Sequence, residues 1–205
     1  MINKFLIRFF DFAFALCGLV ILLPCFIIIA LLVFFDSPGN VIYRQKRVGK
    51  NNRDFFLLKF RTMNMNADQS GLLTVGKKDS RITRTGHFLR RYKLDELPQL
   101  VNVLKGEMSL VGPRPEVRKY VQLYSPEQMK VLAVKPGITD FASIEYSNEN
   151  EILDRANDPE ATYIEKIMPS KILINMKYIK KPSLQNYFLI IFKTVGKIFF
   201  GNNSK

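Results

Sequence analysis

Residues 9–35 read FFDFAFALCGLVILLPCFIIIALLVFF, and this run decides the architecture of the protein. Asp11 is the one charged residue in it. A helix needs about 20 apolar residues to cross the bilayer core, so the run is long enough to enter a membrane. A signal peptide has a shorter apolar core and a small-residue cleavage site, and a soluble core helix is apolar on one stripe only. We therefore expect a membrane helix here.

Pro24 interrupts this run near its middle, where it removes a helical hydrogen bond and bends the helix. Basic residues flank both ends: Lys4 and Arg8 come before, and Arg44, Lys46, Arg47, Lys50 and Arg53 come after. Because positive flanks stay on the cytoplasmic side, a helix that bends at Pro24 and returns to the same face satisfies both flanks. The prediction is a re-entrant helix within residues 1–38. An ordinary span, with the more basic second flank in the cytoplasm, is the alternative.

The composition excludes several classes of protein. The chain has 205 residues, 47% of them hydrophobic and 24% charged, which is typical of a folded protein. Cys17 and Cys25 cannot make a disulfide framework, and His87, the only histidine, cannot make a multi-histidine metal site. The single long apolar run excludes a polytopic transporter.

The rest of the chain divides into a domain large enough to hold a catalytic site, residues 39–183, and a C-terminal segment, residues 184–205. Residues 41–62 predict a β-hairpin, in which VIYRQKRV and DFFLLKFRT are joined by the turn GKNNR. Residues 64–80 are polar and predict a mobile loop, and residues 83–92 predict a short helix capped by Thr85. Residues 184–200 are apolar but carry Lys193 and Lys197, which favours an interfacial helix over a core helix.

The densest segment is LDELPQLVNVLKGEMSLVGPRPE, residues 94–116. Asp95 suits a helix N-cap, with Pro98 in the first turn and Gly106 at the C-terminal end. Leu97, Leu100, Val101 and Leu104 then share one face of that helix. The two prolines around Arg114 leave it little conformational freedom to lose on binding.

The net charge of +13 is unevenly distributed. Residues 40–135 are strongly basic, whereas residues 140–165 are acidic. A basic domain beside a membrane helix fits contact with anionic lipid, binding of a phosphorylated substrate, or binding of nucleic acid. The aromatic residues gather in the terminal apolar segments instead of alternating with the basic ones, so nucleic acid is not expected as a partner.

The adjacent carboxylates Asp95 and Glu96 are the candidate reactive groups. N–H groups at a helix N-terminus hold a carboxylate ionised, an ionised Asp can attack phosphorus, and its neighbour can bind Mg²⁺. A plain helix cap is the competing interpretation. The nearby Arg90, Arg91, Lys93 and Arg114 favour phosphoryl chemistry, since such cations stabilise a transferring phosphoryl group. Lys59 and Arg61 lie on one face of the second predicted strand.

Three segments together resemble the small monotopic phosphoglycosyl transferases, the bacterial initiating sugar-phosphate transferases. They are KFRTM (59–63), RITRTGHFLRRYKLDELPQLVNVLKGEMSLVGPRPE (81–116) and KPGIT (135–139). The resemblance implies transfer of a sugar 1-phosphate from a UDP-sugar to undecaprenyl phosphate, with release of UMP, at the cytoplasmic face of the bacterial inner membrane. It also implies a re-entrant first helix, whose break corresponds to Pro24.

The resemblance assigns roles to individual residues. Asp95 would attack the β-phosphorus and carry a covalent phosphosugar, and Glu96 would help to hold Mg²⁺. Arg90, Arg114, Lys59 and Arg61 match the family's substrate-binding basic positions. The expected fold is mostly α-helical with a small β-hairpin and interfacial helices. The expected partners are the UDP-sugar, undecaprenyl phosphate and membrane phospholipid, and a homodimer is left open.

This chain departs from the family pattern at three places. Leu23 precedes Pro24 where the family often has serine, Lys93 stands where a small hydroxyl residue is frequent, and Asp140 stands where glycine is common. The acidic stretch after Asp140 is a candidate for the choice of sugar, which the sequence does not name. The alternatives are a catalytically inactive membrane adaptor that binds lipid phosphate or a pathway partner, and a transferase that works by single-step displacement.

Overall fold

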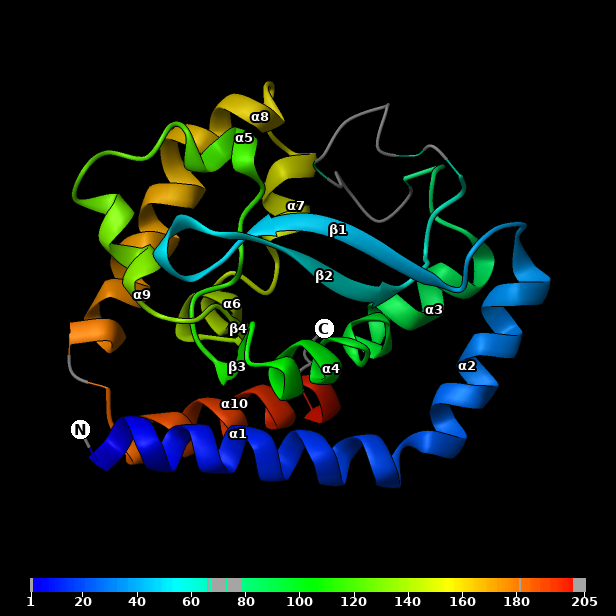
Figure 1. Cartoon of the computed structure of the whole chain (residues 1–205). Coiled ribbons are helices and arrows are strands. Elements are labelled where there is room, and N and C mark those ends of the chain that lie inside the picture. Colours follow the sequence, from blue (N-terminus) through cyan, green and yellow to red (C-terminus); the bar gives the residue numbers. More distant parts are fainter. Residues whose placement is uncertain (1, 66, 68–72, 74–78, 181, 201–205) are drawn as a thin grey trace.

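The computed structural model describes residues 2–65, 67, 73, 79–180 and 182–200 (Figure 1). A long N-terminal helix lies along one side of the molecule, and a β-ribbon with short helices lies above it (Figure 1). The helices are α1 (Ile2–Ile21), α2 (Leu23–Asp36), α3 (Arg84–Arg91), α4 (Gln99–Lys105), α5 (Arg118–Val121), α6 (Phe141–Glu145), α7 (Glu149–Asp154), α8 (Pro159–Thr162), α9 (Met168–Lys180) and α10 (Leu184–Phe200). The strands are β1 (Ile42–Val48), β2 (Asp54–Phe60), β3 (Ser109–Val111) and β4 (Gly137–Thr139).

The N-terminal run folds as two helices with a sharp bend between them. The axis turns by 64° between Asn3–Ile21 and Leu23–Asp36, and Pro24 lies in the first turn of α2. In the described residues no single helix has both the length and the apolarity for a bilayer crossing, but the bent pair together has them. The bend predicted around Pro24 is therefore present.

Most large apolar side chains of α1 and α2 face outward. The exposed ones are Phe5, Phe9, Phe12, Phe14, Leu16, Val20, Ile21, Leu23, Ile27, Ile28, Leu31, Leu32, Phe34 and Phe35. The inner side packs on the rest of the chain through Ala15, Ile29 and Val33, which are buried. A contiguous apolar surface of this extent is unusual for a protein surrounded by water.

The predicted hairpin is confirmed. Strands β1 and β2 pair antiparallel over their whole length, from Ile42 opposite Phe60 to Val48 opposite Asp54. The turn between them uses Asn51 and Asn52, both with positive φ, a conformation that asparagine tolerates. The predicted loop 64–80 falls largely outside the described residues.

The helix predicted over 83–92 is α3, but its cap differs from the prediction. The Thr83 side chain accepts a hydrogen bond from the Gly86 N–H at 3.0 Å, whereas the Thr85 N–H donates to the Asp36 carboxylate at 2.9 Å. The cap prediction for Thr85 was wrong because Thr83, two residues earlier, has the extended backbone that an N-cap needs.

Helix α4 ends as predicted at Gly106, whose φ of 81° is left-handed. The predicted leucine face of α4 is only partly buried. Asn102 is fully buried, and its side chain donates to the Phe56 carbonyl at 2.8 Å and accepts from the Leu58 N–H at 3.0 Å. This asparagine fixes α4 against the edge of β2, a role that apolar periodicity did not reveal.

Strands β3 and β4 form a short parallel pair that the sequence did not predict. The Gly112 N–H donates to the Thr139 carbonyl at 3.0 Å, and the Gly137 N–H donates to the Pro113 carbonyl at 3.0 Å. The two glycine backbones are so close that a Cβ on Gly137 would lie 2.1 Å from the Gly112 nitrogen. The loop that carries Arg114 therefore leaves this strand pair in a fixed direction.

Segments on both sides of β4 build a separate core, in which Tyr120 of α5 packs with Leu153, Tyr163 and residues of α9. Helix α10 then returns beside α1, where the rings of Phe10 and Phe188 lie 5.2 Å apart (Figure 1). Tyr187 and Ile190 are fully buried, whereas Leu189, Phe192, Val195 and Phe200 are exposed. One face of α10 is thus core and the other is apolar surface.

Candidate functional site

The turn that carries the paired carboxylates lies just before α4, not inside it. Lys93 has a φ of 57°, and residues 94–96 form a 3₁₀ turn. Pro98, not Asp95, occupies the cap position of α4. The N-cap prediction for Asp95 was wrong, because the left-handed residue at position 93 starts a separate turn. Asp95 and Glu96 are nevertheless both buried, with 5% and 8% of their surface exposed.

Glu96 is held by two cations. The Arg114 guanidinium donates to both of its carboxylate oxygens, at 2.6 and 3.2 Å, and Lys59 Nζ lies 3.7 Å from Oε1. Burial alone would raise the pKa of Glu96, but the charges of Arg114 and Lys59 overcome it and hold that pKa well below its usual range. The Glu96 charge in turn raises the pKa of Arg114. The charges around Glu96 therefore favour its ionised form.

Asp95 is in a different state from its neighbour. Its Oδ1 is buried and accepts no hydrogen bond from the residues that the structure describes. Burial, followed by the charge of Glu96, raises the pKa of Asp95, while Lys59, Lys93 and Arg90 act in the opposite direction. The expectation that helix N–H groups hold Asp95 ionised was wrong, because burial raises its pKa and the groups that oppose this are the side chains of Lys59, Lys93 and Arg90.

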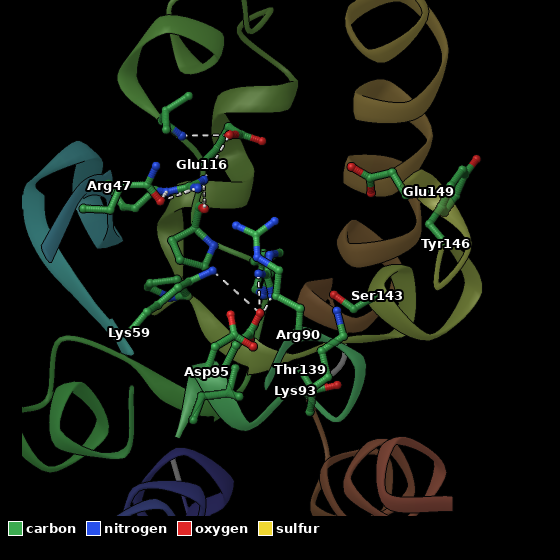
Figure 2. A pocket seen from close by; sticks show the side chains of 18 of the residues that line it. Arg47, Lys59, Arg90, Lys93, Asp95, Glu116, Thr139, Ser143, Tyr146 and Glu149 are labelled. Atoms are coloured by element: carbon green, nitrogen blue, oxygen red, sulfur yellow. Dashed lines mark hydrogen bonds and ion pairs between the residues drawn. The ribbon is translucent and has the colours of Figure 1, made fainter. Parts of the chain in front are cut away.

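Two further predicted cations reach the same place. Lys59 comes from β2, and burial lowers its pKa to about 8 although the Glu96 charge opposes this. Arg90 comes from α3, where its Nε donates to the Thr62 hydroxyl at 2.8 Å. Figure 2 shows Lys59, Arg90 and Asp95 converging on one side of the pocket. Two elements, β2 and α3, thus each place a cation beside the turn that carries Asp95.

Arg61 differs from these cations in its hydrogen-bond partners. Its guanidinium donates to the backbone carbonyls of Val33, Ser37 and Pro38, at 3.2, 2.5 and 2.5 Å. These carbonyls lie at and just after the C-terminal end of α2, where a cation offsets the unpaired carbonyl charge. The prediction that Arg61 binds substrate stays a prediction: Arg61 lines the same pocket as Lys59 and Arg90, but β2 ends at Phe60 and the Arg61 guanidinium is bound to the α2 terminus.

Asp140 positions Arg114. Its buried carboxylate accepts from the Arg114 N–H at 2.8 Å and from the Asn175 side chain at 3.1 Å, and it also caps α6 through the Ser143 N–H. The sequence singled out Asp140 only as a departure from a family pattern. Its spacing to Ser143 was the available signal, because an Asp three residues before a helical N–H is typical of an N-cap.

A large cavity of about 1590 Å³ opens beside these groups. The cations and Asp95 line one side of it, and Ser143, Tyr146 and Glu149 line the other (Figure 2). Lys171 holds Glu149 through a 2.7 Å ion pair. The cavity therefore has a cationic wall suited to phosphate and a mixed polar wall suited to hydroxyl groups.

Comparisons with known proteins agree on one family. The model of a family described as bacterial sugar transferase matches residues 2–201. A UDP-N-acetylgalactosamine-undecaprenyl-phosphate N-acetylgalactosaminephosphotransferase of Aeromonas hydrophila is 39% identical over 203 residues, which is 98% of this chain and 45% of that protein. A UDP-glucose:undecaprenyl-phosphate glucose-1-phosphate transferase of Escherichia coli is 36% identical, over 97% of this chain and 41% of the relative.

A shorter relative matches over most of its own length. The exopolysaccharide production protein ExoY of Sinorhizobium fredii is 32% identical, over 96% of this chain and 87% of that protein. The chain thus spans less than half of the Aeromonas and Escherichia proteins but most of the Sinorhizobium one.

Proposed function

This chain belongs to the bacterial sugar transferase family, and from that premise we propose that it transfers a sugar 1-phosphate from a UDP-sugar to undecaprenyl phosphate through a covalent intermediate on Asp95. A carboxylate oxygen of Asp95 attacks the β-phosphorus, the bond to the bridging oxygen breaks, and UMP leaves. A phosphate oxygen of the lipid then attacks the same phosphorus and releases Asp95.

The observation that carries this proposal is the free Asp95 oxygen. A nucleophile needs a lone pair that is not already bonded, and Oδ1 of Asp95 accepts no hydrogen bond within the described part of the chain. Desolvation makes the carboxylate more basic, and the charges of Lys59, Lys93 and Arg90 favour its anionic form. Glu96, with both oxygens engaged by Arg114, is not free to attack.

The cations around Asp95 suit a diphosphate. Arg114 offers a planar fork, and Lys59 and Arg90 bring charge from two other directions. Charge that builds on the phosphoryl oxygens and on departing UMP meets fixed positive groups, which is the usual source of rate enhancement in phosphoryl transfer.

The residues also fit Mg²⁺. The described residues contain no cluster of three or more His, Cys, Asp or Glu side chains. Mg²⁺ needs fewer protein ligands when substrate phosphates and water complete its shell. We propose that Glu96, ionised and beside the unbonded oxygen of Asp95, holds the ion together with the donor. When bound, Mg²⁺ supplies charge neutralisation of the diphosphate.

The apolar faces of α1, α2 and α10 support membrane association for the second half of the reaction. We propose that the bent pair α1–α2 enters one leaflet and re-emerges, with the cavity facing the cytoplasm of a bacterial inner membrane. A site held at headgroup depth meets the phosphate of a lipid acceptor there, and a covalent intermediate lets the soluble donor and the lipid acceptor use the site in turn.

We place the sugar on the polar wall of the cavity. Tyr146 and Glu149 lie across the cavity from Asp95, at a side that offers hydrogen-bonding groups for sugar hydroxyls (Figure 2). These residues belong to the acidic stretch that distinguishes this sequence. N-acetylgalactosamine and glucose, named for two of the relatives, are the first donors to test.

The deciding experiment measures UMP release by the purified chain with Mg²⁺, several UDP-sugars and undecaprenyl phosphate. Asp95→Asn should abolish release, whereas Asp154→Asn, which changes an exposed acid, should not. Mass spectrometry of protein mixed with donor alone should find one phosphosugar, on Asp95. UMP release only when acceptor is present, with no adduct, would favour single-step displacement. Donor binding without release would favour an inactive adaptor.

A further inference from the structure

Asp11, the one charge in the apolar run, is buried at the centre of a hydrogen-bond cluster. It is 2% exposed, and its Oδ1 accepts from the Ser109 hydroxyl at 3.0 Å, the Leu110 N–H at 2.9 Å and the Tyr187 hydroxyl at 2.9 Å. A buried carboxylate costs several kcal/mol unless it is hydrogen-bonded, and here the three donors supply those bonds. Asp11 thus ties α1 to β3 and α10.

Arg8 makes a second attachment from the same face of α1. Its guanidinium donates to the Val103 and Leu104 carbonyls, at 2.7 and 3.1 Å, near the C-terminal end of α4. Residues three apart share a helix face, so Arg8 and Asp11 point the same way. Gly18 continues this stripe, because a Cβ there would lie 3.2 Å from Leu100.

The two attachments contact the elements next to each half of the site, the Arg114 loop and the Asp95 turn. Strand β3, held by Asp11, runs directly into the loop that carries Arg114. Helix α4, held by Arg8, follows directly after the turn that carries Asp95. The opposite face of α1 exposes Phe5, Phe9 and Phe12. One helix therefore presents apolar rings outward and is bound on its inner side to β3 and α4, the elements next to the site.

We propose that Asp11 and Arg8 are positioning residues that set the height of the site relative to the bilayer, and so govern transfer to the lipid acceptor. This rests on the proposed function. A soluble donor reaches the site at any height, but the phosphate of a lipid is confined to headgroup depth. A misplacement of about 1 Å can cost roughly 10²-fold in rate, so a loosened attachment should affect the second step selectively.

The test uses the full chain in phosphatidylethanolamine–phosphatidylglycerol vesicles that contain undecaprenyl phosphate. Asp11→Ala and Arg8→Ala are compared with Lys4→Ala, which removes an exposed cation from the same helix. Three rates are measured: the UMP burst with donor alone, discharge of the phosphosugar to undecaprenyl phosphate, and discharge to a water-soluble short prenyl phosphate.

The expected result is a split between these rates. Asp11→Ala should keep the burst within about twofold of wild type, lose about tenfold or more with the membrane-bound acceptor, and recover with the soluble acceptor. Asp11→Asn, which keeps one acceptor oxygen, should fall between. Equal losses in both steps and with both acceptors would reduce Asp11 to a stabilising residue and overturn the proposal, as would no loss at all.

A readout independent of catalysis separates this proposal from the proposed function. Cys17 and Cys25 are replaced, and a fluorophore is attached to the cysteine of a Phe88→Cys variant, an exposed position of α3. Quenching of that fluorophore by lipids brominated at known positions reports its depth in the bilayer. Asp11→Ala should shift that depth and Lys4→Ala should not. A wild-type chain without a UMP burst refutes the proposed function, whereas an unchanged depth refutes the positioning role.

Discussion

The guanidinium of Arg114 donates to both carboxylate oxygens of Glu96, and this contact joins the Pro-Arg-Pro loop to the turn that carries Asp95. The two residues come from segments on opposite sides of α4. Their contact therefore measures how well the two halves of the site are assembled.

A double-mutant cycle tests this contact. Arg114→Gln leaves the buried Glu96 charge with Lys59 alone and should lower the free energy of unfolding by about 2 kcal/mol, less than a fully buried pair loses because a third of the Arg114 side chain is exposed. Adding Glu96→Gln should restore about 1 kcal/mol or more. Denaturant unfolding in detergent measures both, and strictly additive effects would refute the coupling.

Asp140 offers a second prediction. Asp140→Ala removes the acceptor for the Arg114 N–H, so the rate of UMP release should fall by roughly 10²-fold as Arg114 loses its position. Asp158→Ala is the matched control: Asp158 caps α8 through the Ala161 N–H at 2.9 Å, far from Arg114 in sequence. Asp158→Ala should lower the free energy of unfolding by about 1 kcal/mol and leave the rate of UMP release unchanged. Similar activity in both variants would contradict the positioning role of Asp140.

Substitutions at Arg61 and Lys59 should have different effects, although the two residues are only two positions apart. Arg61→Met leaves carbonyls at the end of α2 without a donor, and should cost about 2–4 kcal/mol of stability while the KM for the UDP-sugar stays within about twofold. Lys59→Met should instead reduce the UMP burst about tenfold or more, with a smaller change in stability. Thermal unfolding measures the stability of each variant, and donor titration measures its KM and burst. A raised KM in Arg61→Met would support Arg61 as a substrate-binding residue.

The tyrosines give a pH prediction. Burial, and then the charge of Glu160, raise the pKa of Tyr120 to about 12, while burial raises the pKa of Tyr124 and, with the charge of Glu116, that of Tyr163. The unfolded chain ionises near pH 10, so it loses these protons first, and stability should fall as the pH rises above 10.

Absorbance at 295 nm measures this directly, since the chain has eight tyrosines and no tryptophan. At pH 11 the folded protein should show about three fewer tyrosinates than the same protein in guanidinium. Equal absorbance in the two states would contradict the burial of these three phenols.

Local patterns predicted the parts of the fold that depend on local chemistry. Alternation and the GKNNR turn predicted the hairpin, Pro24 predicted the bend, and Gly106 predicted the end of α4. The family motifs placed Lys59, Arg90 and Arg114 around Asp95 and Glu96, and the structure brings these five together.

What the sequence did not reveal has physical reasons. Arg61 stands in a strand-like sequence, but its partners lie more than 20 residues earlier, at the end of α2. Asp11 looks like a stray charge because its partners lie 98 residues and more away. Asp95 looks like a helix cap until Lys93 is seen to be left-handed. The first two depend on tertiary contacts, which spacing along the chain does not encode, and the third depends on a backbone conformation that lysine seldom adopts.

The contact between Gly112 and Gly137 has a consequence for how this sequence can change. Each backbone occupies the space that a side chain on the other residue would need. Because glycine is already the smallest residue, a larger residue at one position cannot be accommodated by a smaller one at the other. In a library that randomises both codons together and selects for folded, active chains, glycine should return at both. Ile138, the middle residue of β4, is only partly buried and should accept several apolar residues in the same selection. The strand pair beside Arg114 is thus a point where the sequence is frozen by main-chain geometry alone.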